Sequence, residues 1–122
     1  MKIRIYDDSI RLRLDRAEVD AIGAGEVVEC ATRFTQGNQF TYRLSAQGEQ
    51  TVASFKDGCI DVCLAQAAAT HWAHTETQVS IVAEEPLDGG VLKLLIEKDF
   101  ECLDPREGED QTNRFKNPKA SA

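Results

Sequence analysis

Residues 7–26, DDSIRLRLDRAEVDAIGAGE, align without a gap on residues 57–76, DGCIDVCLAQAAATHWAHTE, at a constant offset of 50 residues. Similarity at a fixed spacing indicates a duplicated structural unit. The identical pairs are Asp7/Asp57, Ile10/Ile60, Leu14/Leu64, Ala17/Ala67 and Glu26/Glu76, and the pairs Leu12/Val62 and Ile22/Trp72 stay apolar. The chain is therefore predicted to contain two related units.

Two hairpins are predicted to flank one helix in the first unit. Residues 2–6 and 10–14 alternate apolar with polar side chains on either side of a turn at residues 7–9, which is typical of a tight hairpin. The same alternation over residues 28–34 and 40–44 predicts a second hairpin. The order of elements is thus strand, strand, helix, strand, strand.

The helix of the first unit is predicted to begin after Asp15. With Glu18 three residues later, Asp15 forms a capping box that satisfies free N–H groups of the first turn. Val19 and Ile22 supply the apolar side of this helix. The glycines within residues 23–25 are predicted to end it, because glycine adopts positive φ without steric cost.

The second unit repeats this plan. Its strands are predicted over residues 51–55, 59–64, 78–83 and 91–98, and its helix over residues 66–74. Neither unit, at roughly 45 residues, buries enough apolar surface to fold alone. We therefore expect residues 1–102 to form one domain of two units, about 1–46 and 50–98, which share a core. The fragment 1–46 alone is expected to be unfolded or to dimerise.

Length and charge limit the kinds of function. A chain of 122 residues with 42% apolar residues forms one modest core, which excludes a multidomain enzyme. Its net charge of −7 argues against broad affinity for nucleic acid or for anionic membranes. No apolar run approaches the roughly 20 residues of a membrane span. Residues 1–5 alternate charged and apolar side chains unlike a signal peptide, so the expected location is cytoplasmic.

Two resemblances follow from these residues. The run KIRIYDDSIRLRLDRAEVDAIGAGEVVE, residues 2–29, resembles the swapped-hairpin repeat of the AbrB and MazE superfamily. That resemblance implies a mainly β (α+β) fold in which two ββαββ units interleave into one pseudo-two-fold β-barrel with two short helices. The whole chain, including residues 95–110 and the later Phe115, Asn117 and Pro118, also resembles a group of small bacterial proteins of uncharacterised function. This second resemblance implies no activity.

The superfamily resemblance implies DNA binding by antitoxins and transcriptional regulators. The candidate nucleic-acid-binding residues are Lys2, Arg4, Arg11 and Arg13, which alternate with apolar residues on two adjoining strands. Outward charges on a half-buried sheet also serve solubility alone. The repeat argues against symmetric DNA binding, because Asp61 and Cys63 stand at the positions that match Arg11 and Arg13.

Charge is divided unequally between the two halves. Residues 1–45 hold seven positive and seven negative side chains, whereas residues 46–122 hold seven and fourteen. This asymmetry suits a protein partner or a small ligand between the units better than a DNA duplex.

Cysteines and histidines raise the question of a metal site, and none is predicted. Cys59 and Cys63 on one strand are separated by about 13 Å of rise, too far to share a zinc ion. His71 and His74 lie at i and i+3 of the second helix, but HWAH lacks the glutamate of a zinc protease motif. The alternative is that Cys30 packs in the core, that the other strand cysteines are ordinary, and that the histidines are solvated. The thiols, including Cys102, are expected to be reduced.

No catalytic residue and no cofactor is predicted. Motifs for a nucleophile elbow, a phosphate loop or a dinucleotide site are not found in the sequence. The acidic pairs within residues 84–85 and 107–110 are interpreted as solvated charges. Residues 103–122 are expected to form a mobile acidic tail, in which Phe115 is either a spacer or docks into a groove of the domain or of a partner.

The first functional hypothesis is a small cytosolic, non-enzymatic binding or interaction module, monomeric or weakly dimeric, whose partner is a protein or a small ligand and which does not bind membranes. The second is an AbrB/MazE-like DNA-binding regulator or antitoxin. The third is a metal-dependent or small-ligand protein with a site between the two units.

Overall fold

The computed structural model describes residues 1–100, which form eight β-strands and two short α-helices. The first half contains β1 (Lys2–Tyr6), β2 (Ser9–Leu14), α1 (Arg16–Gly23), β3 (Val28–Arg33) and β4 (Gln39–Gly48), with a 3₁₀ turn at Thr35–Gly37. The second half contains β5 (Val52–Lys56), β6 (Cys59–Ala65), α2 (Gln66–His74), β7 (Ser80–Leu87) and β8 (Gly90–Lys98). The predicted mainly β fold and its order of elements are confirmed.

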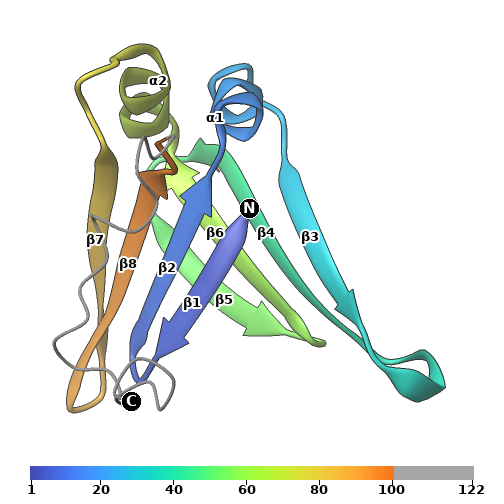
Figure 1. The fold of residues 1–122 in the computed structure, drawn as a ribbon. Helices are drawn as coiled ribbons and strands as arrows, with labels where there is room; N and C mark the ends of the chain where they lie inside the picture. The colour runs from blue at the N-terminus through green and yellow to red at the C-terminus, as the bar shows by residue number, and fades with distance from the viewer. Residues whose placement is uncertain (101–122) are drawn as a thin grey trace, which may run out of the picture.

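Each of the two sheets combines a hairpin from both halves of the chain. The first sheet has the order β1-β2-β8-β7, and the second has the order β3-β4-β6-β5. Hairpin partners pair antiparallel, whereas the central pairs β2·β8 and β4·β6 are parallel. Figure 1 shows the two sheets facing each other below the helices. The two strand orders are equivalent: replacing each strand by its counterpart in the other half converts one order into the other. The relationship of this arrangement to a swapped-hairpin repeat stays a prediction.

The core lies between the two sheets and the helices. Leu12 in β2 stands opposite Ile96 in β8, and Leu44 in β4 stands opposite Val62 in β6. Both halves thus supply the buried side chains: Leu12, Leu14, Val19, Ile22, Leu44, Ala46, Ile60, Val62, Leu64, Ala69, Trp72, Ile81, Leu94 and Ile96. Burial of apolar area of this kind is the main stabilising contribution to folding.

The predicted closed barrel is wrong, because the sheets remain two separate four-stranded sheets. Their edge strands, β1 with β3 and β5 with β7, share no backbone ladder. Side chains bridge the two gaps instead. Glu85 in β7 accepts a hydrogen bond from the N–H of Ala53 in β5. On the other side, the carbonyl of Met1, just before β1, accepts a hydrogen bond at 2.7 Å from Tyr42 Oη in β4, the neighbour of edge strand β3. Pro86 lies in edge strand β7, where a residue without an N–H is tolerated.

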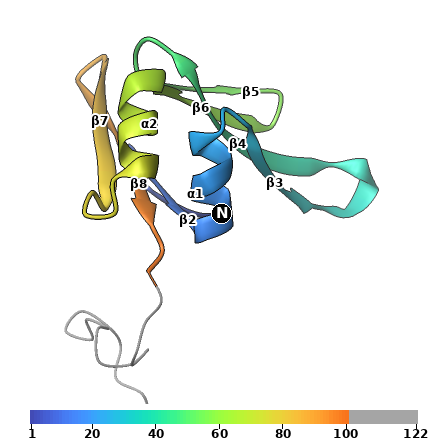
Figure 2. The ribbon, with the colours of Figure 1, turned by 90° about the horizontal axis from the view of Figure 1, so that it is seen from above.

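The two helices pack side by side over one end of the sheets (Figure 2). The predicted capping box is present in α1, since Glu18 N–H donates to Asp15 at 2.9 Å and Asp15 N–H to Glu18 at 3.0 Å. Gly23 is the last residue of α1 and touches α2, because a Cβ built there would lie 2.8 Å from Ala73 Cβ. The predicted stop therefore comes from Gly25, whose φ is +84°.

Trp72 anchors α2 to the sheets. Its side chain is fully buried, and its indole N–H donates to the carbonyl of Val79 at 3.1 Å. Lys98 lies over the indole ring with Nζ 5.6 Å from the ring centroid.

The four hairpin turns of the described residues lie at the end of the molecule opposite the helices (Figure 1). In residues 1–100, no helix has the length and apolar character needed to span a membrane.

Candidate functional site

The four cations predicted from the sequence lie on one face. In the register of β1 and β2, Lys2 stands opposite Arg13 and Arg4 stands opposite Arg11. Their side chains point away from the core because Leu12 and Leu14 of β2 point into it. Lys93 of β8 stands opposite Ser9 and joins the same face. We call the outward surface of the first sheet that carries these five cations the basic face.

Three of these cations form ion pairs with carboxylates. Glu97 Oε1 accepts hydrogen bonds from Arg13 Nε at 3.0 Å and Arg13 Nη2 at 2.9 Å. The same oxygen lies 3.1 Å from Arg11 Nε, which is buried but out of line for a hydrogen bond. Lys2 Nζ lies 3.4 Å from Asp99 Oδ2. Within residues 1–100, Arg4 and Lys93 form no ion pair, so their charges remain available to a ligand.

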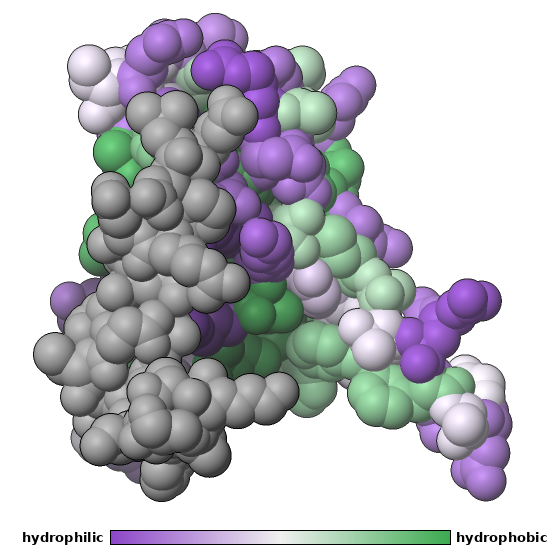
Figure 3. Space-filling model, in the orientation of Figure 1, coloured by the Kyte–Doolittle hydropathy of each residue, from purple (hydrophilic) through white to green (hydrophobic). Residues whose placement is uncertain are grey.

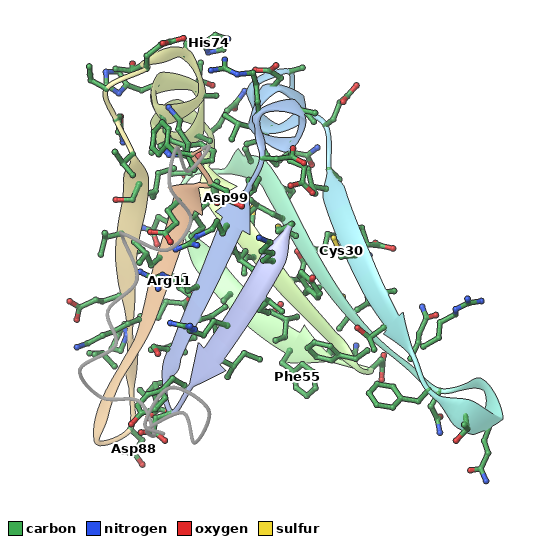
Figure 4. All side chains as sticks on the ribbon, in the orientation of Figure 1. Arg11, Cys30, Phe55, His74, Asp88 and Asp99 are labelled. Carbon is green, nitrogen blue, oxygen red and sulfur yellow. The ribbon has the colours of Figure 1, made fainter. Side chains whose placement is uncertain are left out.

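A shallow hollow of about 490 Å³ lies on the basic face. Arg4, Arg11 and Lys93 line it together with Tyr6 and the apolar Val82. Tyr6 is 75% exposed and Val82 is 69% exposed, although both are strand residues. Figure 4 shows Arg11 over the first sheet, away from the helices and from Phe55. The hollow therefore offers cations, an aromatic ring and apolar surface together.

The matching face of the second sheet has a different charge pattern. Arg43 Nε lies 3.1 Å from Glu29 and its Nη1 lies 3.9 Å from Asp61. Asp61 and Cys63 occupy the positions in β6 that Arg11 and Arg13 occupy in β2. The two outward faces therefore do not present equivalent half-sites to a symmetric ligand.

The cysteines of the described residues are free and half-buried. Cys30 lies in β3 beside the Met1 carbonyl at 3.7 Å, at the edge of the core instead of inside it, which corrects its predicted place. Cys59 and Cys63 are ordinary residues of β6, as the sequence predicts. Cys102 lies outside the described residues.

The two histidines are exposed in the last turn of α2. His71 Nδ1 lies 2.6 Å from Gln78 Oε1, and His74 Nδ1 lies 2.8 Å from the Thr70 carbonyl. In residues 1–100, no group of three or more His, Cys, Asp or Glu side chains has the arrangement of a metal site.

Two polar contacts were not predicted from the sequence. The half-buried Glu85 bonds the edge of β5 and is therefore not a solvated charge. The Met1 amino group is paired with Glu18. Burial alone lowers the pKa of this amino group, but the hydrogen bond and charge of Glu18 outweigh burial, so the pKa is raised. Burial, assisted by neighbouring Cys30, raises the pKa of the Tyr42 hydroxyl. No sequence signal marks these partners, because they lie far apart along the chain.

A cleft of about 460 Å³ opens between α1, α2 and the end of β8. Leu14 and Val19 give it an apolar floor, while Arg16, Asp20 and Lys98 contribute charges of both signs. It lies between elements of the two halves, where the third hypothesis places a ligand.

These features define a small two-sheet β domain with one basic, aromatic-containing face. The chain belongs to a family of unknown function, DUF7009, whose model matches residues 1–119. This membership agrees with the predicted resemblance to uncharacterised proteins. No curated protein and no solved structure matches the chain. Nothing in the comparisons supports the predicted relationship to the AbrB and MazE superfamily.

Proposed function

We propose that this protein is a non-enzymatic cytoplasmic binding module whose basic face binds an acidic segment of a partner protein. One observation carries the proposal. Five cations share one face of a chain whose net charge is −7, and three of them, Arg4, Arg11 and Lys93, line a hollow with the exposed Tyr6 and Val82. A local excess of positive charge against an acidic background steers an acidic partner to that face.

The charge balance of the face favours a protein over a nucleic acid. Its five cations stand beside three carboxylates, those of Glu84, Glu97 and Asp99, which leaves two net positive charges. Arginine and tyrosine are enriched at the centres of protein interfaces, where their planar groups bind and pack together. Arg4 and Tyr6 on β1 are therefore the expected anchors.

The test uses a short fluorescein-labelled peptide of alternating Glu and Tyr residues, titrated with the full chain while fluorescence anisotropy is recorded. Arg4→Glu should weaken binding at least about fivefold, equivalent to about 1 kcal/mol. The matched control is Arg33→Glu, an exposed arginine at the end of β3 in the other sheet, which should leave affinity unchanged. An equal loss of peptide affinity in both variants would show that binding depends only on net charge, and it would contradict a specific role for the basic face.

A second candidate is DNA binding, because Lys2, Arg4, Arg11 and Arg13 do share one face. Duplex DNA replaces the peptide in the same assay. Affinity that falls steeply with salt, with a slope of about 0.9 per neutralised phosphate, and that Arg11→Glu with Arg13→Glu abolishes would favour a regulator. Salt-insensitive or absent binding would exclude it.

A third candidate is a small ligand in the cleft between α1 and α2, where Arg16 and Lys98 supply positive charge. Native mass spectrometry of the untagged protein, purified without chelators, tests it directly. A retained metabolite or metal ion would support this candidate over the first. A bare monomer at 13.5 kDa would direct the search to macromolecular partners.

A further inference from the structure

The inner walls of the two sheets remain apolar at the end that carries the hairpin turns. Residues at inward positions of the pairing register continue the core toward this end. We call this surface the apolar mouth, and it consists of Ile5, Ile10, Phe40, Phe55 and Leu92. Figure 3 shows hydrophobic residues gathered in the hollow beside the protruding β3–β4 hairpin.

The apolar mouth is more exposed than the core that it continues. Ile5 is 53% exposed and Phe55 is 67% exposed. Phe55 stands opposite the buried Ile60, so its ring faces the space between the sheets (Figure 4). Phe40 lies beside Tyr42, with ring centroids 6.1 Å apart. A group of apolar side chains that remain exposed beside the core is typical of a surface that another apolar group covers.

Carboxylates lie in three of the four hairpin turns at the end of the molecule that carries the apolar mouth. Asp7 and Asp8 form the β1–β2 turn, Asp57 lies in the β5–β6 turn and Asp88 in the β7–β8 turn, and all four are exposed. The ends of the hairpins beside the turns carry two cations, Lys56 at the end of β5 and Arg33 at the end of β3, so negative charge prevails there. The expected occupant therefore combines an aromatic or apolar side chain with flanking positive charge.

The chain itself carries such a segment. Residues 113–119, NRFKNPK, place Phe115 between Arg114 and Lys116, with Lys119 close behind and no acidic residue among them. This segment lies outside the described residues. The match of the family model extends to residue 119 and so includes it.

We propose that residues 113–119 bind the apolar mouth of their own chain, with the ring of Phe115 packed against Phe55 and Phe40. Arg114 and Lys116 then lie near the aspartates of the turns. This docking covers apolar surface that the two separate sheets leave exposed, and it involves a different surface from the basic face.

The length of the chain permits this docking. The described residues end near the helices, where Asp99 N–H donates to the Leu14 carbonyl at 2.8 Å. The nine residues of β8 separate that point from the turns by about 26 Å. The fifteen residues 101–115 reach as far as about 50 Å when extended. The tether is therefore long enough to reach the mouth and short enough to keep the segment concentrated near it.

Photocrosslinking in the full chain tests the proposal. Benzoylphenylalanine replaces Phe115, the sample is irradiated, and crosslinked peptides are mapped by mass spectrometry. Crosslinks within the monomer to β1, β4 or β5 near Ile5, Phe40 and Phe55 are expected. Benzoylphenylalanine at Gln111, in the same tail, should give few crosslinks to these strands.

Charge and shape variants make the test specific. Arg114→Glu with Lys116→Glu should reduce the crosslinks to the mouth, whereas Arg106→Glu, outside the segment, should leave them unchanged. Phe55→Ser should also reduce them, and an unchanged Trp72 fluorescence spectrum would show that its fold is retained. Crosslinks found in a covalent dimer would assign the mouth to a second copy and overturn the proposal. Crosslinks spread over the helices, or none to the mouth, would overturn it as well.

Discussion

The carboxylate of Glu85 in β7 accepts a hydrogen bond from the backbone N–H of Ala53 in β5, and so joins edge strands of two sheets that share no backbone ladder. The bond satisfies an outward N–H that the edge of a sheet leaves unpaired. At this one position, a side-chain hydrogen bond joins the two sheets where a closed barrel would have paired strands.

Removal of this carboxylate should destabilise the protein. Glu85→Ala leaves the partly buried N–H of Ala53 without a partner, and a hydrogen bond to a charged group contributes about 1.5–3 kcal/mol. The midpoint of urea unfolding measures the loss. Glu84→Ala, the neighbouring exposed glutamate on the same strand, is the control and should change stability by less than about 0.5 kcal/mol. Equal stability of the two variants would contradict a role for Glu85 at this edge.

The contact between the helices should resist one added methyl group. In Gly23→Ala the new Cβ would meet Ala73 Cβ at 2.8 Å, and overpacking of this kind costs about 1–3 kcal/mol. Alanine is the better helix former by about 1 kcal/mol, so a double-mutant cycle with Ala73→Gly is needed to isolate the clash.

The double variant should lose less free energy of unfolding than the sum of the losses measured for the two single variants. Gly90→Ala serves as a control, because no heavy atom lies within 4 Å of its added Cβ. Simple additivity in the cycle would show that the helices do not approach this closely.

The fragment 1–46 should not form a stable folded monomer. It contains β2 and most of β4 but lacks β8 and β6, which pair with them in the two sheets. Leu12 and Leu44 then lose the partners Ile96 and Val62, and circular dichroism with analytical ultracentrifugation should show an unfolded chain or a dimer. A folded monomer would contradict the shared core.

Stability should fall at alkaline pH through Tyr42. Burial and neighbouring Cys30 raise the pKa of its hydroxyl above the ordinary value of 10.0. The unfolded chain therefore loses this proton first, so the contribution is present below pH 10.0 and is lost as the pH rises through the folded-state pKa.

The titration of Tyr42 can be followed by ultraviolet absorbance in a Tyr6→Phe background, because the chain has only two tyrosines. Its midpoint should lie above 10.0. Tyr42→Phe should remove that part of the alkaline loss of stability, and a midpoint at or below the ordinary value would disprove the buried hydroxyl.

Local features of the fold could be predicted from the sequence, because they depend on neighbouring residues. The capping box of Asp15 and Glu18 and the extent of α2 are examples. The separation of the sheets could not be predicted, since it depends on which edges meet across the molecule. Strand length differs between the edge and the centre of the sheets: β4 has ten residues, whereas the edge strands β1 and β5 have five each. The sequence pattern of a single strand does not show whether its edge will find a partner in the other sheet.

The candidate site could be predicted only in part. Alternation along β1 and β2 correctly placed Lys2, Arg4, Arg11 and Arg13 on one face, because side chains on a strand alternate between faces. Their partial neutralisation by Glu97 could not be foreseen, because it requires the parallel pairing of β2 with β8, 84 residues away in sequence.

The exchange of hairpins between the halves sets an order for synthesis. All four strands of the second sheet have left the ribosome's active centre once residue 65 has been added, whereas the first sheet must wait for β8, which ends at Lys98. The β1–β2 hairpin, made before the other three hairpins, is thus among the last to gain its permanent neighbour. Such distant pairing slows folding, and it leaves the apolar side of β2 in need of protection while translation continues.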